Sequence, residues 1–269
     1  MARAVFWETL RRGWRAALFW GIGIGLIAVL NIVAVPDAHG MEATAKAITK
    51  MGGFVVQLVG GGDLAFLASP AGFLNNQYYA IILLVFAVYA ILAGLNVTAT
   101  EEDKGILDFL LSMPVPRHRI VVEKFLGYAA LSVGVVVVST AFIFLSLDTE
   151  PAVVIPASSV IEASLCIVPG TLIVMAFTAF VASRVRRRRH AAAVAVVFLV
   201  VSWFIDVLGR TATASFVHSL RVISFYAYYD TAGVMQKGLS AIDLAVPLAA
   251  TAVLVAGTVL SFQRRNIGA

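Results

Sequence analysis

Six long apolar segments constrain this chain more than any other feature of its sequence. They are residues 16–35, 78–97, 125–147, 160–182, 191–208 and 244–262. At a rise of about 1.5 Å per residue, a helix of about 20 residues crosses the roughly 30 Å hydrocarbon core of a bilayer. Hydrophobic residues make up 61% of the chain and charged residues 13%, which is more apolar surface than a soluble core can bury. The sequence therefore predicts an all-α integral membrane protein with six transmembrane helices.

The first 15 residues predict a further helix that lies along the membrane surface. Trp7, Leu10 and Trp14 recur at helical spacing, whereas the charged residues between them fall on other faces. Tryptophan favours the headgroup level and arginine favours anionic lipid, so we interpret residues 1–15 as an N-terminal interfacial helix. The alternative is a disordered basic leader. Within the first span, Gly21 and Gly25 form a GxxxG pair that would let another helix approach closely.

Two connections are longer than a turn but contain no run of spanning length. Residues 36–77 are interrupted by proline, glycine and charged residues, and residues 42–50 predict a short helix. Residues 222–235 are rich in aromatic side chains but too polar to span. Both connections therefore predict re-entrant or interfacial helices, one before span 2 and one before span 6.

The distribution of basic residues predicts the orientation. With the N-terminus inside, only Lys46, Lys50, Arg210, Arg221 and Lys237 lie on the outer side, out of 20 basic residues. This positive-inside bias places both termini in the cytoplasm of a multi-pass protein of the plasma (inner) membrane. It also explains the formal net charge of +5 without nucleic acid as a partner. We interpret the arginines at 184 and 186–189 as a membrane anchor, with binding of anionic lipid or nucleotide as the alternative.

The connection between spans 2 and 3 is the most polar stretch of the chain. Its acidic start suits a helix N-terminus, an apolar stripe follows at helical spacing, and two prolines prevent the helix from continuing. The residues are Glu101, Glu102 and Asp103, then Ile106, Phe109, Leu110 and Met113, then Pro114 and Pro116. This pattern predicts a short amphipathic helix on the cytoplasmic side that docks onto something outside the bilayer.

No catalytic constellation is present in the sequence. The four histidines are scattered among different loops, and the chain has no HExxH or GxSxG motif and no GxxxxGK[ST] nucleotide-binding loop. A single cysteine, Cys166, allows no intrachain disulfide and no cysteine-based metal site. We therefore expect a protein that is not an enzyme and that holds no metal or cofactor of its own.

Four polar residues in or near the spans have two interpretations each. Glu162 and Asp206 could serve a proton relay, but near the outer ends of their spans they are also tolerable as ordinary end residues. Tyr89 and Asn96 lie about two turns apart on one face of the second span. They could line a substrate pathway, or they could be satisfied by neighbouring helices.

The connection between spans 2 and 3 resembles that of the permease subunits of ABC-2 type exporters. The resemblance rests on an acidic pair, a glycine, a leucine-rich turn, a Pro-x-x-Arg and a lysine that opens the next span. The matching residues are Glu101, Glu102, Gly105, Leu107, Leu110, Leu111, Pro114, Arg117 and Lys124, with Ile106 in place of the usual threonine. Ser224 and Phe225, Tyr228 to Asp230, and residues 262–267 are similar to the family's C-terminal part.

The resemblance implies one ABC-2 type transmembrane domain over residues 1–269. It implies a second permease copy or homologue and two cytoplasmic ABC ATPase subunits, which bind the ATP and Mg that this chain does not. Membrane lipids surround the complex, and an amphipathic or lipid-like substrate would suit the charge-poor spans. The segment between spans 2 and 3 becomes a coupling helix that contacts the ATPase through Glu101, Glu102, Gly105, Ile106, Phe109, Leu110, Met113, Pro114 and Arg117. Two alternatives stand beside this reading: a membrane scaffold that anchors a cytoplasmic complex, and an ion-coupled carrier without an ATPase.

Overall fold

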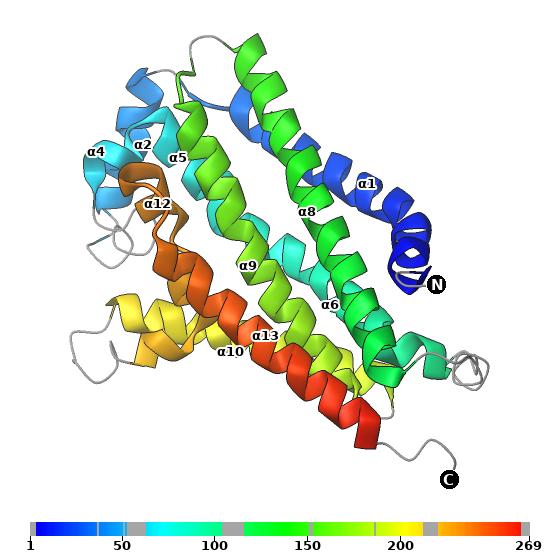
Figure 1. Cartoon of the computed structure of the whole chain (residues 1–269). Helices are drawn as coiled ribbons and strands as arrows, with labels where there is room; N and C mark the ends of the chain where they lie inside the picture. Colours follow the sequence, from blue (N-terminus) through cyan, green and yellow to red (C-terminus); the bar gives the residue numbers. More distant parts are fainter. Residues whose placement is uncertain are drawn as a thin grey trace.

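The computed structural model describes residues 4–36, 38–50, 52, 63–103, 116–150, 153–185, 187–211 and 220–264 (Figure 1). Within these ranges the chain is helical and has no strand. The elements are α1 (Ala4–Val33), α2 (Ala38–Lys50), α4 (Leu64–Leu67), α5 (Pro70–Leu74), the π-helix η1 (Asn75–Tyr79), α6 (Ala80–Asp103), α8 (Arg117–Thr149), α9 (Ala157–Ala182), α10 (Arg188–Thr211), the 3-10 turns η2 (Arg221–Ile223) and η3 (Phe225–Tyr228), α12 (Thr231–Lys237) and α13 (Ala241–Arg264).

Six helices in the described ranges are long and apolar enough to cross a membrane, which confirms the predicted number. Their bounds are Ala4–Val33, Pro70–Thr98, His118–Thr149, Ala157–Ala182, Arg188–Arg210 and Ala241–Gln263. α1 and α8 begin, and α13 ends, at the same end of the bundle (Figure 1). The short helices α2, α4, α5 and α12 lie toward the opposite end. This arrangement agrees with an even number of crossings.

α1 and α8 run in parallel and approach each other closely at glycines. A Cβ added to Gly21 would lie 2.8 Å from Val138 Cβ, and one added to Gly25 would lie 2.7 Å from Phe142 Cγ. Without side chains at these two positions, the backbone of α1 can reach the surface of α8. The expectation that the GxxxG pair lets another helix approach is confirmed, and the partner helix is α8.

α9 forms the centre of the bundle and packs against α6 and α13. Its two threonines do not need water, because both of their hydroxyls bond within the helix. Thr171 Oγ1 donates to the Ile167 carbonyl at 2.9 Å, and Thr178 Oγ1 donates to the Val174 carbonyl at 2.7 Å. A buried helix with satisfied hydroxyls is compatible with a bilayer interior.

The helix boundaries differ from the predictions in three places. Residues 4–33 form one continuous helix, so no break separates the expected interfacial helix from the first span. The second span begins at Pro70 instead of residue 78, because α5, η1 and α6 continue one another. The single helix expected near 222–235 is wrong: the segment forms two 3-10 turns followed by α12, since Ser224 and Asp230 each cap a new turn. α2 confirms the short helix expected at 42–50 and begins four residues earlier.

Candidate functional site

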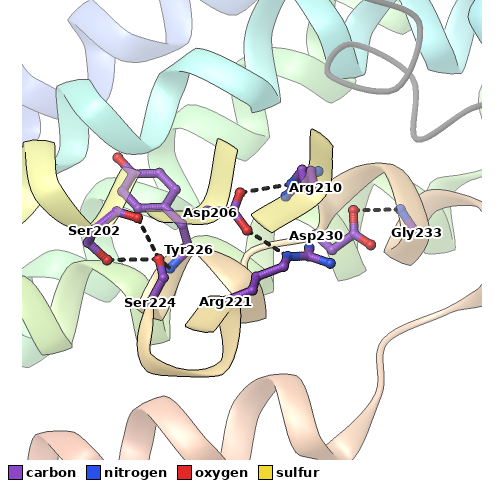
Figure 2. Close-up of polar contacts among 8 residues, drawn as sticks. All are labelled: Ser202, Asp206, Arg210, Arg221, Ser224, Tyr226, Asp230 and Gly233. Atoms are coloured by element: carbon purple, nitrogen blue, oxygen red, sulfur yellow. Dashed lines mark hydrogen bonds and ion pairs between the residues drawn. The ribbon is translucent and has the colours of Figure 1, made fainter. Parts of the chain in front are cut away.

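The most deeply buried carboxylate among the described residues, Asp206, joins two separate elements. It lies on the last turns of α10 and is only 4% exposed. Arg210, one turn further along the same helix, donates from Nε to Asp206 Oδ2 at 2.8 Å. Arg221 of η2 donates from Nε to Asp206 Oδ1 at 2.7 Å (Figure 2). Both carboxylate oxygens are therefore bonded to guanidinium groups, which compensates the cost of burying the charge.

A glycine and two serines bring η2 and η3 against α10. A Cβ at Gly209 would lie 2.8 Å from Arg221 Cβ, so a larger residue would push η2 away. Ser224 donates to the Ser202 carbonyl at 2.7 Å, and the two serine hydroxyls lie 2.9 Å apart (Figure 2). The same Ser224 oxygen accepts the backbone N–H of Tyr226 at 3.1 Å and so caps η3. The segment before α13 is held at several points along α10.

The same segment is also tied to α9 and to the π-helix η1. Tyr229 donates its hydroxyl to the Tyr79 carbonyl at 2.7 Å, across 150 residues of sequence. Glu162 of α9 accepts the Leu239 backbone N–H at 2.9 Å. π-helical turns occur often at functional sites, and here one lies beside the buried polar cluster.

A cavity of about 330 Å³ opens between the start of the second span, the end of α10 and the segment 226–232. Its polar wall consists of Asn75, Asn76, Gln77, Asp206, Arg210, Tyr226, Tyr229, Asp230 and Thr231, and its apolar wall of Ala80, Ile81, Leu84, Trp203, Val207 and Ala232. The volume lies within the range of small-molecule sites. Asp230 lines the cavity and also accepts the Gly233 N–H at 3.3 Å at the start of α12 (Figure 2).

The tyrosines of this wall stay neutral under physiological conditions. Burial, with a smaller contribution from the Asp206 carboxylate, raises the pKa of Tyr226 above its ordinary value. Burial likewise raises the pKa of Tyr229 well above the ordinary value. Among the described residues, no group of three or more His, Cys, Asp or Glu side chains could hold a metal ion. The cluster offers charge and hydrogen bonds for binding rather than a nucleophile or a metal.

The structure gives partners to the two acids considered for proton coupling. Asp206 is bonded to two arginines and Glu162 to a backbone N–H, and both lie near the ends of their helices. These contacts favour the interpretation as structural end residues. Tyr89 is buried with its ring 5.9 Å from that of Trp20, and Asn96 is half-buried on the same helix. Neither lines the cavity beside Asp206, so their role in a substrate pathway stays a prediction.

The predicted coupling helix lies mostly outside the described residues. Glu101 and Glu102 occupy the last turn of α6, and Arg117 is the first residue of α8. Gly105, Ile106, Phe109, Leu110, Met113 and Pro114 all fall in the part of the chain that the structure does not describe. The contact with an ATPase therefore stays a prediction.

A family model settles the class of the protein. The model of the ABC-2 family transporter proteins matches residues 3–267, which is nearly the whole chain. The chain belongs to this family. It is thus a membrane permease of an ABC transporter, and membership of this family implies association with an ABC ATPase. No protein with a curated description matches this ABC-2 chain.

Sequence reasoning missed the arginines that bind Asp206 in this ABC-2 permease. From the charge distribution alone, Arg210 and Arg221 are two of the five basic residues on the outer side. Arg210 stands four residues after Asp206, a spacing at which opposite charges meet on a helix, so this pair carried a readable signal. Arg221 carried none, because its contact depends on how the chain returns after α10.

Proposed function

We propose that this chain is the permease subunit of an ATP-driven exporter and that separate cytoplasmic ATPase subunits drive it through residues 101–117. The observation that carries this proposal is the family match over residues 3–267, together with six apolar helices of spanning length. The chain contains no GxxxxGK[ST] motif, so the hydrolysis of ATP falls to the partner. The partner binds the ATP and Mg.

The charge pattern supports a cytoplasmic position for residues 101–117. The end of α6 and the start of α8 lie at the same end of the bundle as the start of α1 (Figure 1). The basic residues 184 and 186–189, which follow α9, belong to the same side in the proposed topology. In this topology both termini lie on the cytoplasmic side of the plasma (inner) membrane. The three acids at the end of α6 would complement a basic surface on the ATPase. The apolar stripe that follows them would fit an apolar groove of the same partner.

The packing of the helices suggests how a force applied to residues 101–117 would be transmitted through the bundle. α8 packs mainly on α1, and α6 packs mainly on α9, while α6 and α8 touch each other much less. At the start of α8, Glu123 accepts from Arg119 at 2.7 Å and from the backbone N–H of Phe6 at 3.3 Å, which links α8 to α1. α1 with α8 and α6 with α9 therefore form two closely packed pairs, which contact each other less. In the sequence, residues 104–116 connect the second helix of one pair, α8, to α6 of the other. When the ATPase subunits close around ATP, we expect the α1–α8 pair and the α6–α9 pair to move relative to each other.

The exporter reading implies further partners. We propose a second permease copy or homologue across the membrane-embedded interface, surrounding membrane lipids, and an amphipathic or lipid-like substrate. Nothing in the sequence or the described residues calls for nucleic acid. A carrier coupled to ions is less well supported, since Asp206 and Glu162 have protein partners near the helix ends. A membrane scaffold would need the same ATPase contact but would move no substrate.

The test is reconstitution of the permease with its ATPase in lipid vesicles. Glu102→Lys reverses a charge at the end of α6, and Phe109→Ala shortens the apolar stripe. We expect the transport rate of both variants to fall at least tenfold, because the contact that transmits force is weakened. ATP hydrolysis should then no longer be coupled to substrate transport. Glu42→Lys, at an exposed residue of α2 near the other end, is the control for charge and should transport normally. Normal transport by both test variants would contradict the proposal, and ATPase stimulation without transport in the unmodified protein would favour the scaffold.

A further inference from the structure

The cavity beside Asp206 has a polar zone and an apolar zone, in the order that an amphiphile requires. The polar residues Asn75 to Gln77, Asp206 and Arg210 lie at the ends of the second span and of α10. Ile81, Leu84 and Trp203 line the cavity deeper along these two helices and are 54%, 37% and 39% exposed, so part of each side chain stays accessible at the surface of the bundle. A headgroup at the polar end would therefore leave its tails along the bilayer-facing side of the same cavity.

The charged side chains that line the cavity are Asp206, Arg210 and Asp230. Asp206 is bonded to Arg210 and to Arg221, so its charge is compensated. Among the described residues, no lysine or arginine forms an ion pair with Asp230, whose carboxylate accepts the Gly233 N–H at 3.3 Å. Arg210 gives its Nε to Asp206, and a guanidinium carries four further N–H groups. A ligand with one positive and one negative group complements Asp230 and Arg210 together.

Two buried polar atoms on residues of this wall have no hydrogen-bond partner among the described residues. They are Asn75 Oδ1 and the Tyr226 hydroxyl, on side chains that are 3% and 4% exposed. An unpaired acceptor, and a carboxylate that accepts a single backbone N–H, favour a ligand that brings N–H donors. A primary ammonium supplies three such donors, whereas a quaternary ammonium supplies none.

We propose that this cavity binds the headgroup of a zwitterionic phospholipid with a primary amine, of the phosphatidylethanolamine type. The ammonium group pairs with Asp230, the phosphate pairs with Arg210, and the acyl chains lie against Ile81 and Leu84. This inference goes beyond the transport proposal, because the cavity binds the headgroup whether or not the lipid is moved. Its failure would leave the ATPase contact at residues 101–117 untouched.

The experiment measures lipid retention on the purified full-length chain by native mass spectrometry in a mild detergent. The probes are phosphatidylethanolamine, phosphatidylcholine and phosphatidylglycerol with identical acyl chains, and soluble phosphoethanolamine as the headgroup alone. We expect the unmodified chain to retain phosphatidylethanolamine at least several-fold better than the other two lipids. Soluble phosphoethanolamine should compete only at much higher concentration, since it lacks the contacts with the apolar wall.

Asp230→Asn is the decisive variant, because asparagine also caps a helix start and so preserves α12 while removing the charge. We expect it to lower the retention of phosphatidylethanolamine about tenfold, as for the loss of one charged hydrogen bond. Asp63→Asn, at an exposed acid that accepts backbone N–H groups at the start of α4 and lies outside the cavity lining, is the matched control and should stay within twofold. Equal retention of the three lipids by the unmodified chain would overturn the proposal without any variant. A preference for phosphatidylglycerol, or equal effects of the two substitutions, would overturn it as well.

Discussion

Asp206 and Arg221 stand 15 residues apart in the sequence, and their side chains meet at 2.7 Å. The contact joins the end of α10 to η2 and so fixes the turn by which the chain returns toward α13. It also positions one wall of the cavity, because Asp206, Arg210 and the segment 226–232 belong to that wall.

Asp206→Asn should destabilise the protein by about 2–4 kcal/mol, because Arg210 and Arg221 would both lose a charged partner in a largely buried site. Thermal unfolding in detergent would report this as a clear fall in Tm. Glu42→Gln breaks an exposed pair with Lys46 and should leave the Tm unchanged. Equal behaviour of the two variants would mean that the Asp206 contacts contribute little.

Gly25→Ala should destabilise the α1–α8 contact by about 1–3 kcal/mol, since the new Cβ would lie 2.7 Å from the Phe142 ring and one of the helices must shift. Gly23→Ala is the matched control on the same helix, because its Cβ would have no atom within 4 Å. There the gain in helix propensity should stabilise the protein by about 0.5–1 kcal/mol. Unfolding curves of the two variants should therefore shift in opposite directions, and a shift in the same direction would be the contrary result.

Tyr229→Phe and Tyr226→Phe remove one oxygen each from neighbouring rings. The Tyr229 hydroxyl donates to the Tyr79 carbonyl at 2.7 Å, so its loss should cost about 1 kcal/mol. The Tyr226 hydroxyl has no partner among the described residues, so its removal should cost nothing or stabilise slightly. Denaturation in the absence of added lipid compares the two, and a larger loss in Tyr226→Phe would show that its hydroxyl is bonded after all.

The raised pKa values of Tyr226 and Tyr229 predict a loss of stability at alkaline pH. The unfolded chain ionises these tyrosines near pH 10, while the folded chain keeps them neutral to higher pH. Their contribution is therefore fully present below pH 10 and declines as the pH rises above it, by roughly 1 kcal/mol for Tyr226 at pH 11. Between pH 8 and pH 11, Tyr226→Phe should lose about that much less stability than the unmodified protein. Identical losses would indicate that Tyr226 ionises as readily in the folded state.

The six spans could be predicted because the bilayer imposes a length and a composition that the sequence must meet. The α1–α8 contact was partly readable as well, since Gly21 and Gly25 indicate a close helix approach, although not which helix approaches. The start of the second span was missed because Asn75, Asn76 and Gln77 lower the hydropathy there. The structure continues the helix through these residues as the π-helix η1.

The cavity and its charges could not be predicted from the sequence. Asp206 was recognised as an unusual acid near a span, but its bond to Arg221 depends on a return of the chain after α10. The bond from Tyr229 to Tyr79 joins residues 150 positions apart, and no local pattern specifies it. Such contacts follow from the packing of helices and not from the periodicity within any one of them.

Whether residues 101–117 meet an ATPase on the cytoplasmic side is measured most directly with a single cysteine at position 109. The chain has only one cysteine, so Phe109→Cys combined with Cys166→Ala provides a unique label. A membrane-impermeant maleimide should react in inverted vesicles but not in right-side-out vesicles or cells. A cysteine-directed cross-linker should join this position to a polypeptide that binds ATP and contains GxxxxGK[ST]. Labelling from the outside, or a cross-link pattern without any ATP-binding partner in vesicles that transport, would contradict the proposed role.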